Sequence, residues 1–104
     1  MKLTKDQKAE LKVMKADVEL HMGELNLAYL GGHSVIAFVR NFQTSKMVSV
    51  AVSYFDKTES DKYRKATGTY FAVLRLLEGE LVQMPLGHLT NEEIACQLAE
   101  SFGV

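Results

Sequence analysis

The sequence predicts an α+β fold in a single domain, residues 1–104. We expect a three-stranded antiparallel β-meander plus a short edge strand, with helices packed on one face and the order α-β-β-β-α-β-α. Three observations predict this class. The chain has 104 residues, 47% of them hydrophobic, which is enough for one core. Segments of helical period alternate with short segments of strand character, and turn residues separate them.

The first helix is predicted over residues 4–22. Thr4 and Gln7 form a capping box, in which each side chain satisfies the backbone N–H of the other residue. The apolar residues then recur every three or four positions, which gives the helix one buried face. Those residues are Leu11, Met14, Val18, Met22 and Leu25.

Three strands follow. The pair Gly31-Gly32 is a two-residue hairpin signal between strands Leu25–Leu30 and Ser34–Phe42, because glycine reaches positive φ at little cost. The third strand, residues 47–55, alternates valine with serine and alanine. That alternation predicts a strand buried on one face only.

The second helix is expected to begin near Ser60, and a short edge strand lies within residues 80–87. Pro85 fits the end of an edge strand because it cannot donate to a β-ladder. Thr90 and Glu93 form a second capping box and begin the last helix. Its inner stripe is Ile94, Leu98 and Phe102, and we expect Cys96 to be buried beside them.

Charge and composition exclude several classes of protein. The formal net charge of −1 argues against duplex nucleic-acid binding, which usually requires a basic domain. A single cysteine fits a reducing compartment, and we found neither a signal-peptide core nor an apolar run long enough to span a bilayer. We therefore expect a cytoplasmic protein without membrane contact. Apolar residues on both faces of the second and third strands further predict a homo-oligomer.

Catalytic signatures are missing from the sequence. There is no phosphate-binding GxxxxGK[ST] loop, no GxSxG and no HExxH, and the three histidines lack metal-ligand spacing. We therefore predict no enzyme, no catalytic residue, no metal and no cofactor.

The stretch "DKYRKATGTYFAVLR", residues 61–75, is the candidate ligand site. Gly68 interrupts a helical pattern, where glycine costs about 1 kcal/mol relative to alanine. Basic residues cluster in the first turns, where exposed amides attract anions although lysine and arginine oppose the helix dipole. Two readings remain open. Gly68 lets the helix cross the sheet closely, or the segment binds an anion through Arg64 and Lys65 beside Tyr63.

The same stretch resembles a motif in small proteins of phages and prophages, which place an acidic residue, an aromatic, a basic residue, a glycine, an alanine and an arginine on a helix after a β-meander. The matching residues are Asp61, Tyr63, Lys65, Gly68, Ala72 and Arg75. Some of those proteins are similar to the anti-Thoeris sponges, which hold a cyclic-nucleotide signal of the bacterial host without cleaving it. The resemblance implies subunit-junction ligand residues at Tyr63, Arg64, Lys65 and Arg75, joined by Arg40 and Asn41.

Three functions are therefore considered. The first is a phage-type counter-defence protein that sequesters a nucleotide-derived signal in the host cytoplasm without catalysis. The second is a protein–protein inhibitor or adaptor that blocks a host enzyme or immune complex through an acidic patch, such as Glu92, Glu93 and Glu100, or through an open sheet edge. The third is a single-stranded nucleic-acid platform formed by Phe38, Tyr54 and Phe55 near Arg40.

Overall fold

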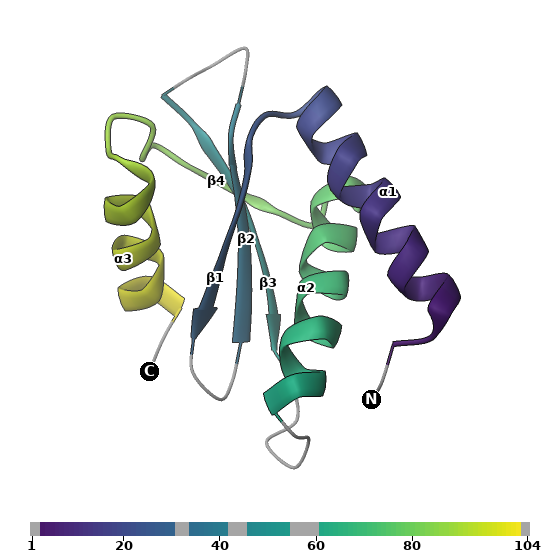
Figure 1. The fold of residues 1–104 in the computed structure, drawn as a ribbon. Coiled ribbons are helices and arrows are strands. Elements are labelled where there is room, and N and C mark those ends of the chain that lie inside the picture. Colours follow the sequence, from purple (N-terminus) through teal and green to yellow (C-terminus); the bar gives the residue numbers. More distant parts are fainter. Residues whose placement is uncertain (1–2, 31–33, 42–45, 55–60, 103–104) are drawn as a thin grey trace.

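The computed structural model describes residues 3–30, 34–41, 46–54 and 61–102, the first four residues of the last range as backbone only. Within these ranges the chain forms helices and strands in the predicted order (Figure 1). Their bounds are α1 Lys5–His21, β1 Leu25–Leu30, β2 Ser34–Arg40, β3 Val48–Tyr54, α2 Asp61–Glu78, β4 Val82–Met84 and α3 Asn91–Phe102.

The four strands form one antiparallel sheet in the order β1-β2-β3-β4. The predicted α+β class, the meander and the short edge strand are therefore confirmed. β4 pairs with the first three residues of β3 and is followed directly by Pro85, as expected for an edge strand. The Gly31-Gly32 turn lies outside the described residues.

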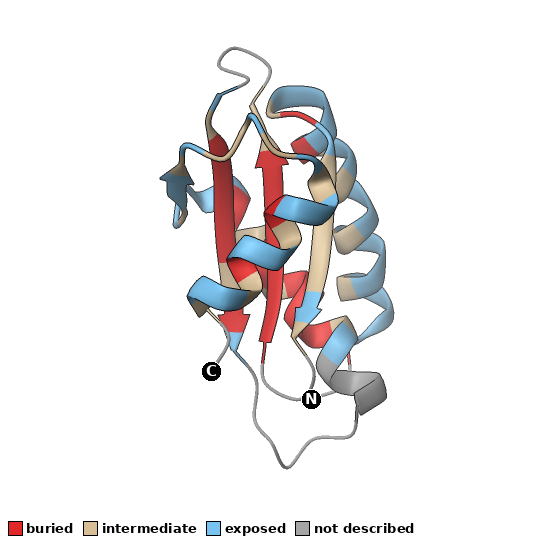
Figure 2. Cartoon of the chain, turned by 90° about the vertical axis from the view of Figure 1, so that its left-hand side faces the viewer, coloured by how far each residue is buried: buried red, intermediate tan, exposed pale blue. Residues whose placement is uncertain are grey.

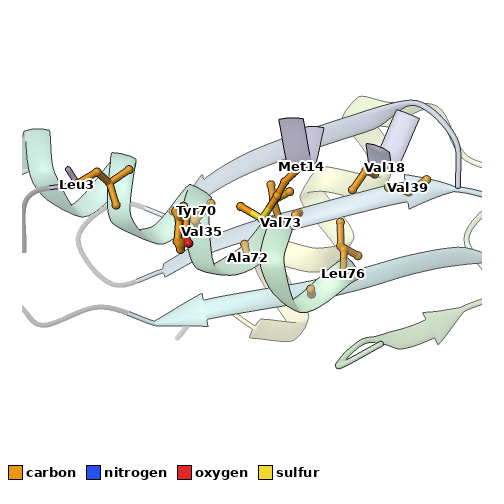
Figure 3. Close-up of a cluster of buried hydrophobic side chains, with 11 residues drawn as sticks. Leu3, Met14, Val18, Val35, Val39, Tyr70, Ala72, Val73 and Leu76 are labelled. Carbon is orange, nitrogen blue, oxygen red and sulfur yellow. The ribbon is translucent and has the colours of Figure 1, made fainter. Parts of the chain in front are cut away.

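Helices α1 and α2 cover one face of the sheet. Odd-numbered residues of β2 and Ala51 of β3 point into this layer, where Met14 and Val18 of α1 meet Val73 and Leu76 of α2 (Figure 3). Tyr70 of α2 lies against α1, where its hydroxyl forms a hydrogen bond with the Glu10 carboxylate. This bond raises the pKa of the Tyr70 hydroxyl, and burial and the negative charges of Glu10 and Glu78 raise it further.

Helix α3 covers the opposite face, so the expectation that all helices pack on one face was wrong (Figure 1). Ile94 and Leu98 of α3 pack on Ile36 and Phe38 of β2 and on Val48 and Val50 of β3. The physical reason lies in β2, whose residues from Val35 to Val39 are all apolar. A strand that is apolar on both sides requires a helix on each side.

Strand β3 differs from its prediction for the same reason. Ser49 and Ser53, expected to face solvent, are buried at 1% and 3% exposure beneath α1 and α2. The two central strands are therefore buried on both faces, as the red strands of Figure 2 show. Phe38 is also buried, at 2% exposure. Its ring therefore cannot stack on a nucleobase, as the hypothesis of a single-stranded nucleic-acid platform requires.

The helix ends follow the sequence closely. Both capping boxes form: Gln7 N donates to Thr4 Oγ1 at 3.1 Å, and Glu93 N donates to Thr90 Oγ1 at 3.2 Å. α2 ends in a Schellman motif, in which Gly79 takes φ 81° and Glu80 N donates to the Arg75 carbonyl at 2.9 Å. This turn directs the chain towards β4.

Within α2, Gly68 lies in the helix face that carries the buried Ala72 and Leu76, at intervals of four residues. Small residues at two successive turns let a helix backbone approach the sheet. The burial of Gly68 thus favours the packing explanation over the ligand explanation.

On α3, Cys96 was predicted to be buried and is exposed. Ile94 and Leu98 occupy the inner face, and a position midway between them points away from the sheet. Across the helices that the structure describes, none combines the length and the apolar character needed to cross a membrane.

Candidate functional site

Lys65 lies on the first half of α2 and is exposed. Its ammonium nitrogen lies 5.6 Å from the ring centroid of Tyr29 in β1, a cation–π contact. Tyr29 Oη lies 3.4 Å from Thr69 Oγ1, which donates to the Lys65 carbonyl at 2.7 Å. Lys65 is therefore held near β1 while its charge stays accessible to solvent.

Arg75 lies near the end of α2 and has a different neighbour. One of its terminal nitrogens, Nη1, donates to the backbone carbonyl of Val52 in β3. Val52 lies two residues beyond Val50, the last β3 residue that pairs with β4. The guanidinium therefore satisfies a strand carbonyl at the point where β4 has ended, which is a structural role.

Arg40 and Asn41 are adjacent in the chain but point to opposite faces of the sheet, because successive strand residues alternate. Arg40 Nη2 donates to the Leu89 carbonyl just before α3, and its buried Nε has no hydrogen-bond partner among the described residues. Asn41 Oδ1 accepts from Ser49 Oγ at 3.0 Å, beneath the other helix layer. Each side chain thus has its own contact within the fold.

The described candidates do not meet at one site. Lys65 reaches β1, whereas Arg75 reaches β3, two strands and about 10 Å away across the sheet. The two residues are also separated by ten positions of α2, a rise of about 15 Å. Arg40 lies at the far end of β2. The side chains of Tyr63 and Arg64, the remaining candidates, lie outside the described residues.

The hollows on the described surface include two of several hundred Å³. One, of about 400 Å³, lies beside the free part of β3 and is lined by Val52, Tyr54, Gly79–Val82 and Phe102 among others. The second, of about 330 Å³, lies on α3 between Leu89 and Gln97 and includes Glu92 and Glu93. Neither contains Lys65, Arg75 or Arg40, and two carboxylates make the second unsuitable for an anion.

The outer edge of β1 is an open sheet edge, a feature that we considered from the sequence without assigning it to a strand. In an antiparallel sheet the N–H and C=O of one residue point the same way, and those of the next residue point the other way. Asn41 N donates to Met47 O at 3.3 Å, so the odd residues of β2 point towards β3. Its even residues therefore point towards β1 and bond to Asn26, Ala28 and Leu30.

It follows that the backbone groups of Leu25, Leu27 and Tyr29 point away from the sheet. No backbone partner for them is found within the ranges given above. We call these three N–H and three C=O groups the β1 edge. β1 carries no charge and no proline, and its Tyr29 side chain is 48% exposed. The signal was available in the sequence, because the first strand of a meander lies at its edge.

Comparison of the chain with protein-family models, with curated proteins and with solved structures returned no match. Among the described residues, no group of three or more histidine, cysteine or carboxylate side chains is placed to hold a metal ion.

Proposed function

We propose that the protein is a non-catalytic binding module that engages another protein by accepting one of its extended segments at the β1 edge. The observation that supports this most strongly is the row of outward-pointing backbone groups at Leu25, Leu27 and Tyr29. An exposed strand edge binds a peptide through main-chain hydrogen bonds, as in β-augmentation.

The geometry of β1 fits such a ligand. Its outward residues are two positions apart, about 7 Å along the strand, which is the spacing at which a second strand presents its own groups. Tyr29 flanks the edge on the side of α2, and its exposed ring offers contact area to a neighbouring side chain. Backbone bonds would supply affinity, and the tyrosine would supply selectivity.

The resemblance to phage proteins indicates the kind of partner. In this proposal the partner is an enzyme or immune complex in the cytoplasm of a bacterial host, and binding blocks it. Blocking needs no catalytic group, in keeping with the contacts of Arg40, Asn41 and Arg75 inside the fold.

The test is capture of partners from bacterial lysate by the immobilised protein and by two proline variants. Leu27→Pro removes an outward N–H from the β1 edge. Gln83→Pro is the matched control. Val48 and Val50 of β3 direct their backbone groups towards Met84 and Val82, so the N–H of Gln83 between them points outward at the other edge. We expect a partner to be retained by the wild type and by Gln83→Pro and lost with Leu27→Pro. Recovery of no partner at any salt concentration, or equal recovery by both variants, would contradict the proposal.

A second candidate function is the sequestration of a nucleotide-type anion beside Tyr29 and Lys65. The observation in its favour is the exposed cation over a half-exposed ring, because a nucleotide offers a phosphate to the first and a base to the second. Calorimetry with a panel of cyclic nucleotides tests it. Binding that is lost in Lys65→Ala and kept in Arg75→Lys supports this site, and the absence of any heat with every nucleotide argues against it.

A further inference from the structure

Helix α1 carries two apolar stripes on opposite sides. The inner stripe is Leu11, Met14 and Val18, which pack into the core or against it. The outer stripe is Ala9, Val13, Ala16 and Leu20, whose positions differ by four, three and four residues. At about 100° per residue, its centre lies about 180° from that of the inner stripe.

The outer stripe is exposed along its whole length. Val13 is 60% exposed and Leu20 is 72% exposed, and both alanines are exposed as well. Figure 1 shows why: α1 lies at the outside of the molecule next to α2, so the side opposite its inner stripe faces away from the rest of the chain. A surface helix normally places polar residues there.

The spacing of the outer stripe is that of a coiled-coil seam. Ala9 and Ala16 occupy d positions of a heptad, and Val13 and Leu20 occupy a positions. The residues that flank such a seam, at e and g, set the choice and direction of the partner helix. Here the g positions are Lys5, Lys12 and Glu19, and the e positions are Glu10 and Asp17.

The charged residues at these e and g positions distinguish a parallel partner helix from an antiparallel one. In a parallel pair, each g residue faces the e residue five positions further along the other helix. A second copy of α1 would therefore place Lys5 opposite Glu10 and Lys12 opposite Asp17, and two-fold symmetry repeats both pairs. An antiparallel pair of the same seam would bring Lys12 near Glu19, but it would also bring Glu10 near Asp17, carboxylate against carboxylate, which is unfavourable. The parallel pair has no such like-charge contact, because the position five residues after Glu19 lies beyond the end of α1.

We propose that the outer stripe of α1 is a dimer interface, in which a second copy of this chain packs its own α1 in parallel. The second copy lies on the side away from α2, so the remaining elements of the two copies stay apart (Figure 1). The two alanines at d let the helix axes approach closely. Lys5, Glu10 and Lys12 are exposed, and Asp17 is half-buried. Glu10 also meets the Tyr70 hydroxyl, and a carboxylate has acceptor sites for both partners.

The interface is small, since the seam from Ala9 to Leu20 spans about 16 Å. We therefore expect a reversible dimer whose population rises with protein concentration. This inference is independent of the proposed function, because the β1 edge and the outer stripe are different surfaces.

The experiment is sedimentation equilibrium of the whole chain over a range of concentrations. We expect a mass that rises from 11.6 kDa to twice that value for the wild type. Val13→Asp places a charge in the seam and should leave a monomer at every concentration. Val82→Asp is the matched control: Val82 is 56% exposed on β4, and its variant should dimerise as the wild type does. Circular dichroism verifies that both variants are folded.

Charge exchange tests the parallel direction. Lys12→Glu alone should weaken the dimer at least several-fold at low salt, and the double variant Lys12→Glu with Asp17→Lys should restore it. Ala16→Cys, in a Cys96→Ser background, should form an intermolecular disulfide on oxidation, because a parallel pair places the two Ala16 positions side by side.

Three results would overturn the inference. One is a wild type that stays monomeric at all concentrations. Another is a dimer that Val13→Asp leaves intact. The third is a dimer that Leu27→Pro abolishes while Val13→Asp does not, which would assign self-association to the β1 edge instead.

Discussion

The two edges of the sheet, β1 and β4, differ in how readily they could pair with a strand of another chain. β4 has three residues and is followed by Pro85 at one end, and past its other end, at Val82, the Arg75 guanidinium occupies the next free carbonyl of β3. β1 has six residues, no charge and no proline, and three of its residues direct their backbone groups outward. Short strands, prolines and inserted charges are common ways to prevent an edge from pairing with other chains. The protein uses them at one edge only, which indicates that the other edge is available for binding.

The largest expected effect separates the two sides of β1. Ala28→Pro removes an N–H that points towards β2 and should lower the free energy of unfolding by at least about 2 kcal/mol. Leu27→Pro removes an outward N–H. Relative to Leu27→Ala, which accounts for lost packing, it should cost less than about 1 kcal/mol. Urea unfolding of the three variants measures both differences. Equal costs for the two prolines would contradict the assigned direction of the backbone groups.

The next effect concerns the β4 edge of the sheet, where Arg75 contacts β3. Arg75→Met leaves the Val52 carbonyl without its donor and should lower the free energy of unfolding by about 1–3 kcal/mol. Arg75→Lys keeps a charged donor and should recover part of that loss.

The Arg75→Met variant should also change the self-association of the protein. With Arg75 removed, β3 presents a free carbonyl beyond β4, so Arg75→Met should self-associate more strongly than the wild type in light scattering. A variant that is destabilised without any gain in association would show that Arg75 stabilises the fold but does not protect the edge.

The smallest effect is a pH dependence at the start of α3. A backbone hydrogen bond from Thr90, followed by one from its side chain, lowers the pKa of Glu93 below its ordinary value of 4.5. A lowered pKa in the folded state stabilises the protein above the unfolded-state pKa, and the contribution is lost as the pH falls through the folded-state value. Unfolding followed between pH 6 and about pH 3 should show a shallower acid decline for Glu93→Gln than for the wild type. Identical declines would contradict this role.

The local features of the fold were accessible from the sequence because short-range chemistry determines them. Thr4 with Gln7 and Thr90 with Glu93 predicted two helix starts that the structure shows. Pro85 predicted where the edge strand ends. The face chosen by α3 was not predicted, although the uninterrupted apolar run of β2 required cover on both sides. In this case the pattern of β3 was taken as half-buried, whereas helices cover both faces of the two central strands.

The candidate ligand set failed for two physical reasons. Arg40 and Asn41 are neighbours in a strand, and the two-residue period places neighbours on opposite faces, which the sequence could have excluded. Arg75 could not have been assigned in the same way. Its contact with Val52 depends on β4 beginning only at Val82, opposite Val50, and that follows from the turn that the chain makes at Gly79.

Amide hydrogen exchange of β1 tests the open edge most directly. In the isolated protein at low concentration, the amides of Leu25, Leu27 and Tyr29 should exchange rapidly, whereas those of Asn26, Ala28 and Leu30 should be protected. When a partner is bound, the first three should become protected as well. Equal protection of all six amides in the isolated monomer would mean that the β1 edge is already occupied, which would contradict the account.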